Sequence, residues 1–248
     1  MAVIKTSMYG GELELTFESL THRYTLNGAK VPSVTTIISE TEPKPALLYW
    51  SANCASDYWK EAIKPDVGYD EVQLETFWRE AKRAHTIKKD DAASVGSVTH
   101  RYVESFIKGE NPDLPINEIA RGAGERFMSW VAEHKVKFLS AEQMVLSRSK
   151  GYCGQADFFC VVDGKLWLGD LKTSNAIYSS YFEQCSAYIQ ARNEEFPSES
   201  FAGFIIVRVG KEDGELEVKQ ITNTGPYMDV FNKRVELYKS LQVIKTLK

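Results

Sequence analysis

Two aspartates and a lysine in the middle of the chain are the residues whose types and spacing are best suited to chemistry. They are Asp157, Asp170 and Lys172, and the last two form an Asp-Leu-Lys tripeptide. If the two carboxylates lie close together, their charges repel and raise one pKa unless a cation compensates. Carboxylate oxygens are the ligands that Mg²⁺ and Mn²⁺ prefer. The three residues therefore indicate a divalent metal site, provided that the fold brings them together.

The turn and strands expected around these residues predict that the fold brings the two aspartates and the lysine together. Asp163-Gly164 is a typical two-residue hairpin turn, and such a turn makes Val162 face Lys165. Continuing that register places Asp157 opposite Asp170. Opposed residues point to the same face with Cβ atoms about 4.5–5.5 Å apart, and the lysine two positions later shares that face.

The apolar composition of this hairpin predicts that both of its faces are buried. A buried carboxylate must be paired, coordinated or open to a cleft, because a lone one costs several kcal/mol. The alternative to a metal site is a buried Asp–Lys salt bridge at a strand end. Phe159, Val161, Leu166 and Leu168 are expected on the acidic face, and Phe158, Cys160, Val162 and Trp167 on the other.

Two helices carry further candidates. His100 can offer a neutral imidazole to a metal, and Glu104 shares its helix face one turn later. Gln184 and Tyr188 share a helix face in the same way and can hold a phosphate or the lysine. The alternatives are a core histidine and a half-buried polar pair. Glu142, at the start of the first core strand, is either a supporting acid or a solvated charge.

These positions together resemble the motifs of the PD-(D/E)XK nuclease superfamily in its RecB-like branch. That branch has an Asp on one strand, D-x-K on the next and Q-x-x-x-Y on the following helix, which match Asp157, Asp170 to Lys172, and Gln184 with Tyr188. Its upstream G-x-x-x-H matches Gly96 and His100. The stretch VPSVTTIISETEPKPALLYW is similar to the start of small phage-type and mitochondrial-maintenance exonucleases of this branch.

The resemblance implies a metal-dependent DNA exonuclease. In that interpretation Asp157, Asp170, the Leu171 carbonyl and His100 bind one or two Mg²⁺ or Mn²⁺ ions, and Lys172 positions or deprotonates the attacking water. The supporting or substrate-binding residues would be Glu104, Gln184, Tyr188, Thr173 and Ser174. The implied substrate is DNA that is single-stranded or has a free end, and a recombination or single-strand-binding protein is a possible partner.

Composition limits how DNA can be bound. The chain has 30 basic and 34 acidic residues and a net charge of −4, so it has no global basic footprint. Contacts must be local, and the candidates are Lys88, Lys89, Arg101, Arg148 and Lys150, with Trp78 or Tyr102 stacking on a base.

The four cysteines favour reduced core thiols and a reducing compartment. They contain no CxxC pair, and none follows Cys185, so we expect no iron–sulfur cluster of the kind found in several RecB-like relatives. With no apolar segment that could form a signal or span, we expect neither secretion nor a membrane partner. The cytoplasm of a bacterial or phage-infected cell is the location that the family resemblance implies.

The expected fold is α+β, with a restriction-endonuclease-like core of a mixed central sheet flanked by helices. We expect one nuclease domain over 1–248, in which residues 1–135 form an N-terminal hairpin and a helical region carrying the His motif, and 136–248 form the catalytic sheet core. Strands are predicted near 141–148, 152–163, 165–173, 201–209 and 215–221, and helices near 45–63, 70–85, 91–109, 116–135, 178–195 and 226–246.

Two other functions fit the same residues. One is a DNA-binding accessory module that keeps a nuclease-like fold without cleaving. The other is a nuclease acting on branched structures or on RNA, because metal-assisted hydrolysis attacks a phosphodiester in either polymer.

Overall fold

The computed structural model describes residues 3–210 and 215–247, and for residues 91–95 only the backbone. The chain is α+β and divides into two compact units. The first unit comprises Met1–Thr41 and Val98–Lys248, and the second comprises Glu42–Ser97. This division does not follow the boundary expected near residue 135, because the N-terminal strands group with the sheet core.

The first unit begins with a four-stranded antiparallel sheet, which we call the N-terminal sheet. Its strands are β1 (Val3–Met8), β2 (Leu13–Glu18), β3 (Arg23–Leu26) and β4 (Ala29–Val31), in that order, and a 3-10 turn, η1 (Tyr9–Gly11), joins β1 to β2. The turn between β3 and β4 is at Asn27 and Gly28, whose φ angles of 47° and 84° are those of a type I′ turn. The expected N-terminal hairpin is therefore part of a larger sheet, because β1 also pairs with β2.

The central sheet has five strands in the order β5-β6-β7-β8-β9. They are β5 (Lys137–Ser147), β6 (Tyr152–Val162), β7 (Lys165–Thr173), β8 (Phe201–Val209) and β9 (Leu216–Ile221). Strands β7 and β8 are parallel and the other neighbours are antiparallel, so the sheet is mixed as predicted. The sequence Glu212-Asp213-Gly214 predicts a turn between β8 and β9, and it lies outside the described residues.

The helices largely follow the sequence pattern. The first unit contains α1 (Val34–Thr41), α4 (Glu118–Glu133), α5 (Ser179–Glu195) and α6 (Gly225–Thr246). The second contains α2 (Pro45–Ala62), which begins at its proline as predicted. The expectation of two helices between residues 70 and 109 was wrong. A single helix, α3 (Glu71–Ile107), runs through both patterns, because no proline interrupts them. It continues from the second unit into the first.

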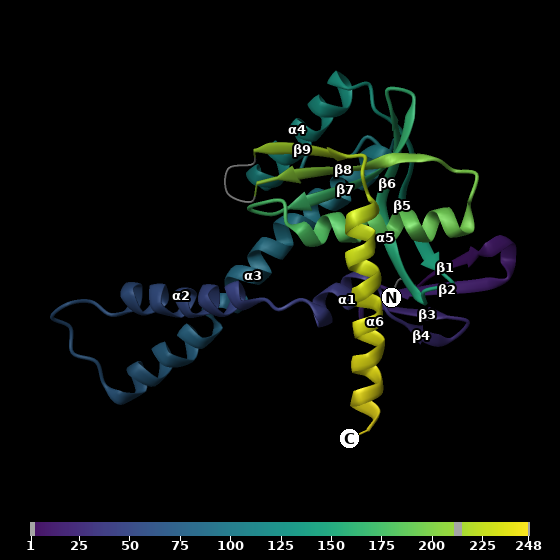
Figure 1. Ribbon diagram of the computed structural model, residues 1–248. Coiled ribbons are helices and arrows are strands. Elements are labelled where there is room, and N and C mark those ends of the chain that lie inside the picture. The colour runs from purple at the N-terminus through teal and green to yellow at the C-terminus, as the bar shows by residue number, and fades with distance from the viewer. Residues whose placement is uncertain (1–2, 211–214, 248) are drawn as a thin grey trace. The chain divides into compact units, whose positions relative to one another are not determined.

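Helices of the first unit cover both faces of the central sheet (Figure 1). Phe159 and Leu168 pack on one face in a core cluster with residues of α1, α5 and α6. Phe158 and Trp167 pack on the other face with α4 and the C-terminal turns of α3. The predicted division of the β6–β7 hairpin into two buried faces is therefore confirmed for these side chains.

The β6–β7 hairpin has the predicted register. Val162 pairs with Lys165, and the ladder continues to Phe158 opposite Gly169. A Cβ on Gly169 would lie 1.8 Å from the Phe158 ring, so only glycine fits immediately before Asp170. Among the described residues, no helix is long and apolar enough to cross a membrane.

Candidate functional site

Three acidic residues occupy corresponding positions on three neighbouring strands. On β5, Glu142 lies between the pairs Ala141–Phe158 and Gln143–Ala156, a position that faces Asp157 on β6. Asp157 in turn is one residue beyond the last pair of the β6–β7 ladder, on the side of Asp170. Neither ladder pairs the backbone of Asp157. The strands therefore separate where the acids gather, which leaves room for their side chains.

One imidazole and two carboxylates form a cluster at this position. Ligand atoms of His100, Glu142 and Asp157 all lie within 4.8 Å of one another. The His100 Nδ1 is 3.8 Å from Asp157 Oδ2, and the same oxygen accepts a 2.7 Å hydrogen bond from the backbone N–H of Leu171. This hydrogen bond fixes the Asp157 carboxylate just beyond the last backbone pair of the β6–β7 ladder. A set of two carboxylates and one imidazole has the chemistry of a divalent-metal site.

The cluster opens into a small pocket in the first unit. Its walls come from the C-terminal turns of α3 and from three strands: His100, Val103, Glu104, Ile107, Glu142, Asp157, Phe158 and Leu171. Glu104 lines this pocket as expected from its helix face, and its carboxylate also pairs with Lys108 on the exposed side.

Glu142 is the most perturbed carboxyl group of the cluster. Burial raises its pKa to about 8, and the negative charges of Asp157 and Glu104 act in the same direction, against Lys108. Its backbone has a φ of 51°, which is unusual for a glutamate inside a strand. Both features show that the carboxyl is held in this acidic pocket at a cost, and such sites are often functional.

Asp170 and Lys172 form a second, deeper group on β7. Asp170 is 1% exposed, and its Oδ1 accepts a 2.9 Å hydrogen bond from Lys172 Nζ. Its Oδ2 has no partner among the described residues. Burial raises the pKa of Asp170, with a further increase from Asp157, against the lowering effect of the lysine. For Lys172, burial alone would lower the pKa, but the two aspartates outweigh it and raise the pKa above its usual value.

A hydrogen-bonded chain from α5 holds this pair in place. The side-chain amide of Gln184 accepts from Lys172 Nζ at 3.3 Å and donates both to Asp170 Oδ1 at 3.4 Å and to the Tyr188 hydroxyl oxygen at 3.1 Å. Tyr188 is buried against Gly154 of β6, where a Cβ would come within 2.3 Å of the ring. The predicted pair Gln184 and Tyr188 thus contacts the catalytic candidates through the amide.

The remaining predicted residues lie at the edge of this arrangement. Thr173 ends β7 and pairs with Val209, and Ser174 follows it with its hydroxyl donating to the Ala176 carbonyl at 2.8 Å. Gly96 lies on α3 one turn before His100 and is buried. The structure therefore places the predicted site residues between positions 98 and 188 in one region, around two adjoining groups: His100, Glu142 and Asp157, and Asp170, Lys172 and Gln184.

The groups proposed to contact DNA are spread more widely. Lys88, Lys89 and Trp78 are exposed on the part of α3 that belongs to the second unit. Arg148 pairs with Glu12 at 2.7 Å beside the β5–β6 turn. Tyr102 is 6% exposed, so it is a wall rather than a free stacking platform.

Glu142 is the residue whose importance sequence reasoning underrated. Its position follows from the observed register of β5 and β6, in which Ser147 pairs with Tyr152, but the four-residue connection does not select this register by itself. Continuing that register along both strands brings Glu142 opposite Asp157, by the same reasoning that aligned Asp157 with Asp170.

Comparison with known proteins adds little to this geometry. No protein-family model matches the chain, and no curated protein matches it by sequence. Among solved structures, the crystal structure of SSO0001 is similar over 79% of this chain and 86% of that chain, with 14% identity and a TM-score of 0.41. A similarity this weak supports no conclusion about fold family or function. The functional proposal is therefore based on the geometry of the site.

Proposed function

We propose that the protein is a metal-dependent DNA exonuclease with a PD-(D/E)XK core. The observation that supports this most is the position of the cluster of His100, Glu142 and Asp157 beside the buried Asp170–Lys172 pair on the next strand. A salt bridge alone would explain the pair, but not the imidazole and two further carboxylates that adjoin it.

The residues fit a divalent ion of the Mg²⁺ or Mn²⁺ type. His100, Glu142 and Asp157 would hold it, and Asp170 has an unpartnered buried oxygen among the described residues that suits a further ligand. The family resemblance adds the backbone carbonyl of Leu171 to this set. A bound ion of this kind acidifies water and stabilises negative charge on phosphoryl oxygens. The cluster carries an excess of negative charge, which a cation would neutralise.

Lys172 is our candidate for the group that acts on the attacking water. Hydrogen bonds to Asp170 and Gln184 fix its ammonium, and its side chain is 17% exposed, so it reaches the solvent-accessible side of the pair. From there the ammonium would orient the attacking water and offset negative charge on the phosphate. The reaction is hydrolysis of a phosphodiester bond.

The finer parts of the proposal rest on the family resemblance. These are the choice of DNA over RNA, of exonuclease over endonuclease, and of a cytoplasmic role in recombination, repair or replication in a phage-infected or bacterial cell, with a recombination or single-strand-binding protein as a possible partner. The charge balance adds one constraint, since a chain of net charge −4 must bind DNA through local contacts.

The first test is degradation of end-labelled linear DNA, single- and double-stranded, beside a closed circle in Mg²⁺ or Mn²⁺. Wild type is compared with Asp170→Asn and with Asp163→Asn as a matched control. Asp163 is exposed at the tip of the same hairpin with φ of 51°, a conformation that asparagine tolerates. We expect wild type and Asp163→Asn to degrade linear DNA, and Asp170→Asn to leave it intact.

Two other outcomes would change the proposal. Rapid cleavage of the closed circle would favour a structure-specific endonuclease. DNA binding without any metal-dependent cleavage by wild type would favour an accessory module that has kept the fold and lost the reaction.

A further inference from the structure

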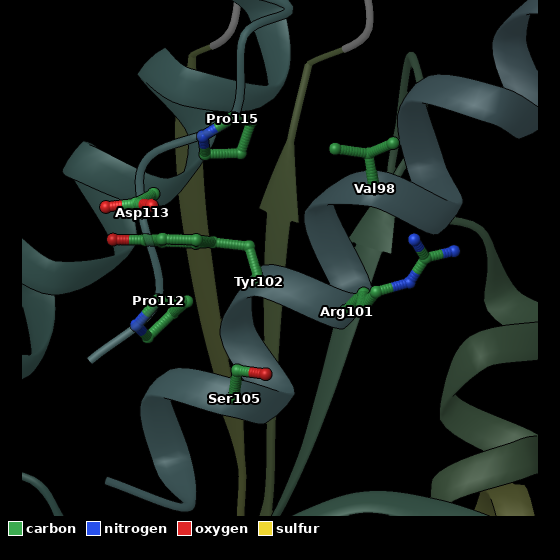
Figure 2. A pocket seen from close by; sticks show the side chains of 7 residues that line it. All are labelled: Val98, Arg101, Tyr102, Ser105, Pro112, Asp113 and Pro115. Carbon is green, nitrogen blue, oxygen red and sulfur yellow. The ribbon is translucent and has the colours of Figure 1, made fainter. Parts of the chain in front are cut away.

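The tyrosines around the candidate site contact different groups. Tyr102 extends from α3 toward the loop that carries Asp113 (Figure 2), and Tyr188 accepts a hydrogen bond from the glutamine of its own helix. Tyr181, in the first turn of α5, lies beside the candidate catalytic lysine, because Lys172 Nζ is over its ring at 4.9 Å from the ring centre. A cation within about 6 Å of a ring centre is attracted by the negative face of the ring.

The contact joins a charged amine to a neutral ring. Burial raises the pKa of Tyr181, against the effect of the nearby ammonium, so the phenol keeps its proton at neutral pH. Lys172 keeps its charge, because the two aspartates raise its pKa above the usual value. The Tyr181 ring is half-buried and packs against the core cluster that α5 shares with the central sheet. Attraction between a cation and a ring is stronger in such a partly desolvated place than at an exposed one.

The ring supplements the hydrogen bonds of the ammonium and does not replace them. An ammonium has three N–H donors. Lys172 uses two of them, toward Asp170 Oδ1 at 2.9 Å and the Gln184 amide oxygen at 3.3 Å. Among the described residues, the third N–H has no hydrogen-bond partner, so it is available to a water molecule. The Tyr181 ring limits how the ammonium can move around its two fixed hydrogen bonds.

The chain around Tyr181 fixes the ring in its place. The Tyr178 ring contacts it edge-on, with ring centres 5.5 Å apart and an angle of 80° between the planes. In the connection between β7 and α5, the Ser174 hydroxyl donates to the Ala176 carbonyl at 2.8 Å. The Arg208 guanidinium donates to the Ser174 carbonyl, also at 2.8 Å. The connection that sets the distance from the lysine strand to the ring is therefore held by hydrogen bonds.

We propose that Tyr181 is a positioning residue of the nuclease, which holds the Lys172 ammonium by a cation–π contact where it can meet the attacking water. The inference rests on the proposed function for the reaction itself. Because the ring acts through the lysine, its loss should lower kcat and leave KM little changed.

The first test separates electrostatic attraction from packing. Tyr181 is replaced by phenylalanine, by phenylalanines with one, two or three ring fluorines, and by leucine, and kcat and KM are measured on end-labelled linear DNA. Fluorine withdraws electron density from the ring face and nearly preserves the shape of the ring. We expect Tyr181→Phe to keep most of the activity and each added fluorine to lower kcat further. Tyr181→Leu should lose about tenfold, or about 1.4 kcal/mol, which is within the range of a partly desolvated cation–π contact.

Tyr227→Leu is the matched control. Tyr227 of α6 is half-buried against the same core cluster, and its ring lies 5.1 Å from that of Phe182. The substitution removes an aromatic ring from the same packing environment, so it should leave kcat unchanged. If Tyr181→Leu does not fold, the fluorinated variants still carry the test, because they keep the ring.

The second test needs no cleavage. In protein labelled with ¹³C-lysine and kept in EDTA, the ε-methylene signal of Lys172 is assigned by its loss in Lys172→Arg. The ring current of Tyr181 should shift this signal upfield of those of exposed lysines in wild type and in Tyr181→Phe. In Tyr181→Leu or, if that variant does not fold, Tyr181→Met, the signal should return toward the position of exposed lysines.

Two results would overturn the inference. One is a kcat that is the same for phenylalanine and trifluorophenylalanine, because the ring would then serve packing alone. The other is a Lys172 signal that does not respond to removal of the ring. Either result in a protein that degrades DNA leaves the nuclease standing. A wild type that shows the ring-current shift but never cleaves DNA refutes the proposed function, and with it the catalytic purpose of the contact.

Discussion

Replacement of Glu142 by glutamine should have opposite effects on stability with and without a metal ion. In the metal-free protein the carboxyl group is held near Asp157 and Glu104, and its pKa is raised from 4.5 to about 8. The folded state therefore binds a proton that the unfolded state has lost between these two pH values. Stability falls as pH rises through this window and levels off above it.

The structure gives the size of the effect. At about 1.36 kcal/mol for each unit of pKa, the full difference would be about 5 kcal/mol. Solvent reaches this carboxyl group in part, so we expect about 1–2 kcal/mol. Glutamine imitates the protonated acid and cannot ionise. At pH 9 in EDTA, Glu142→Gln should therefore be more stable than wild type by this amount, or about 3–6 °C in Tm, while at pH 4.5 the two proteins should match.

Addition of Mg²⁺ or Mn²⁺ should reverse this order. A ligand that binds only the folded state stabilises it, by about 2.7 kcal/mol at a hundred times its Kd. Wild type should gain this stabilisation, and the variant should gain much less because one of the three clustered ligands has lost its charge. Glu236→Gln changes an exposed glutamate on α6 and should behave as wild type in both conditions.

Thermal unfolding followed by circular dichroism at pH 4.5, 7 and 9, with EDTA or with metal, measures all of these values. The reasoning is refuted if Glu142→Gln destabilises the metal-free protein at pH 9, because the acid would then be stabilising without an ion. It is also refuted if the variant keeps the full metal-induced rise in Tm.

The other variants address the reaction and the packing behind it. Lys172→Ala should lower turnover about a hundredfold or more and keep the metal-induced rise in Tm, since removal of one group that stabilises transition-state charge costs about 10²–10³-fold; undiminished cleavage would remove the lysine from the mechanism. Gly154→Ala should destabilise the protein by about 1–3 kcal/mol in urea, because the new Cβ would meet the Tyr188 ring at 2.3 Å. Gly68→Ala, where a Cβ meets nothing within 4 Å, is its control, and an equal cost for both would contradict the packing argument. Gln184→Leu should reduce kcat more than Tyr188→Phe, because the amide hydrogen-bonds both Lys172 and the buried aspartate, whereas the phenol's hydrogen bond among the described residues is to the amide; equal losses would disprove this order.

The parts of the site that could be predicted from sequence are those fixed by short-range rules. The two-residue turn at Asp163-Gly164 leaves one register for β6 and β7, so the neighbourhood of Asp157 and Asp170 followed from counting residues. The helical spacing of Gln184 and Tyr188 likewise placed them on one face, and their hydrogen bond confirms it.

The parts that could not be predicted depend on longer connections. Four residues join β5 to β6, and a loop of that length does not select a register by itself. Glu142 could therefore be assigned either to solvent or to the site. Its positive φ and the ladder gap at Asp157 are tertiary features that no local pattern encodes.

The arrangement of charges explains why the acids fall into two groups instead of the single ligand set implied by the family motif. Without an ion, three neighbouring carboxyl groups cannot all be charged at low cost. The negative charge of each carboxyl group is offset in a different way. The Lys172 ammonium neutralises Asp170, and the raised pKa of Glu142 leaves that group protonated at neutral pH. Asp157 accepts a hydrogen bond from the Leu171 N–H. Two of these three interactions can change when a cation binds, because Glu142 can lose its proton and the Lys172 ammonium can turn toward a new anion. A purely structural salt bridge would need neither, so the uneven electrostatics favour a site built to receive a metal and a phosphate.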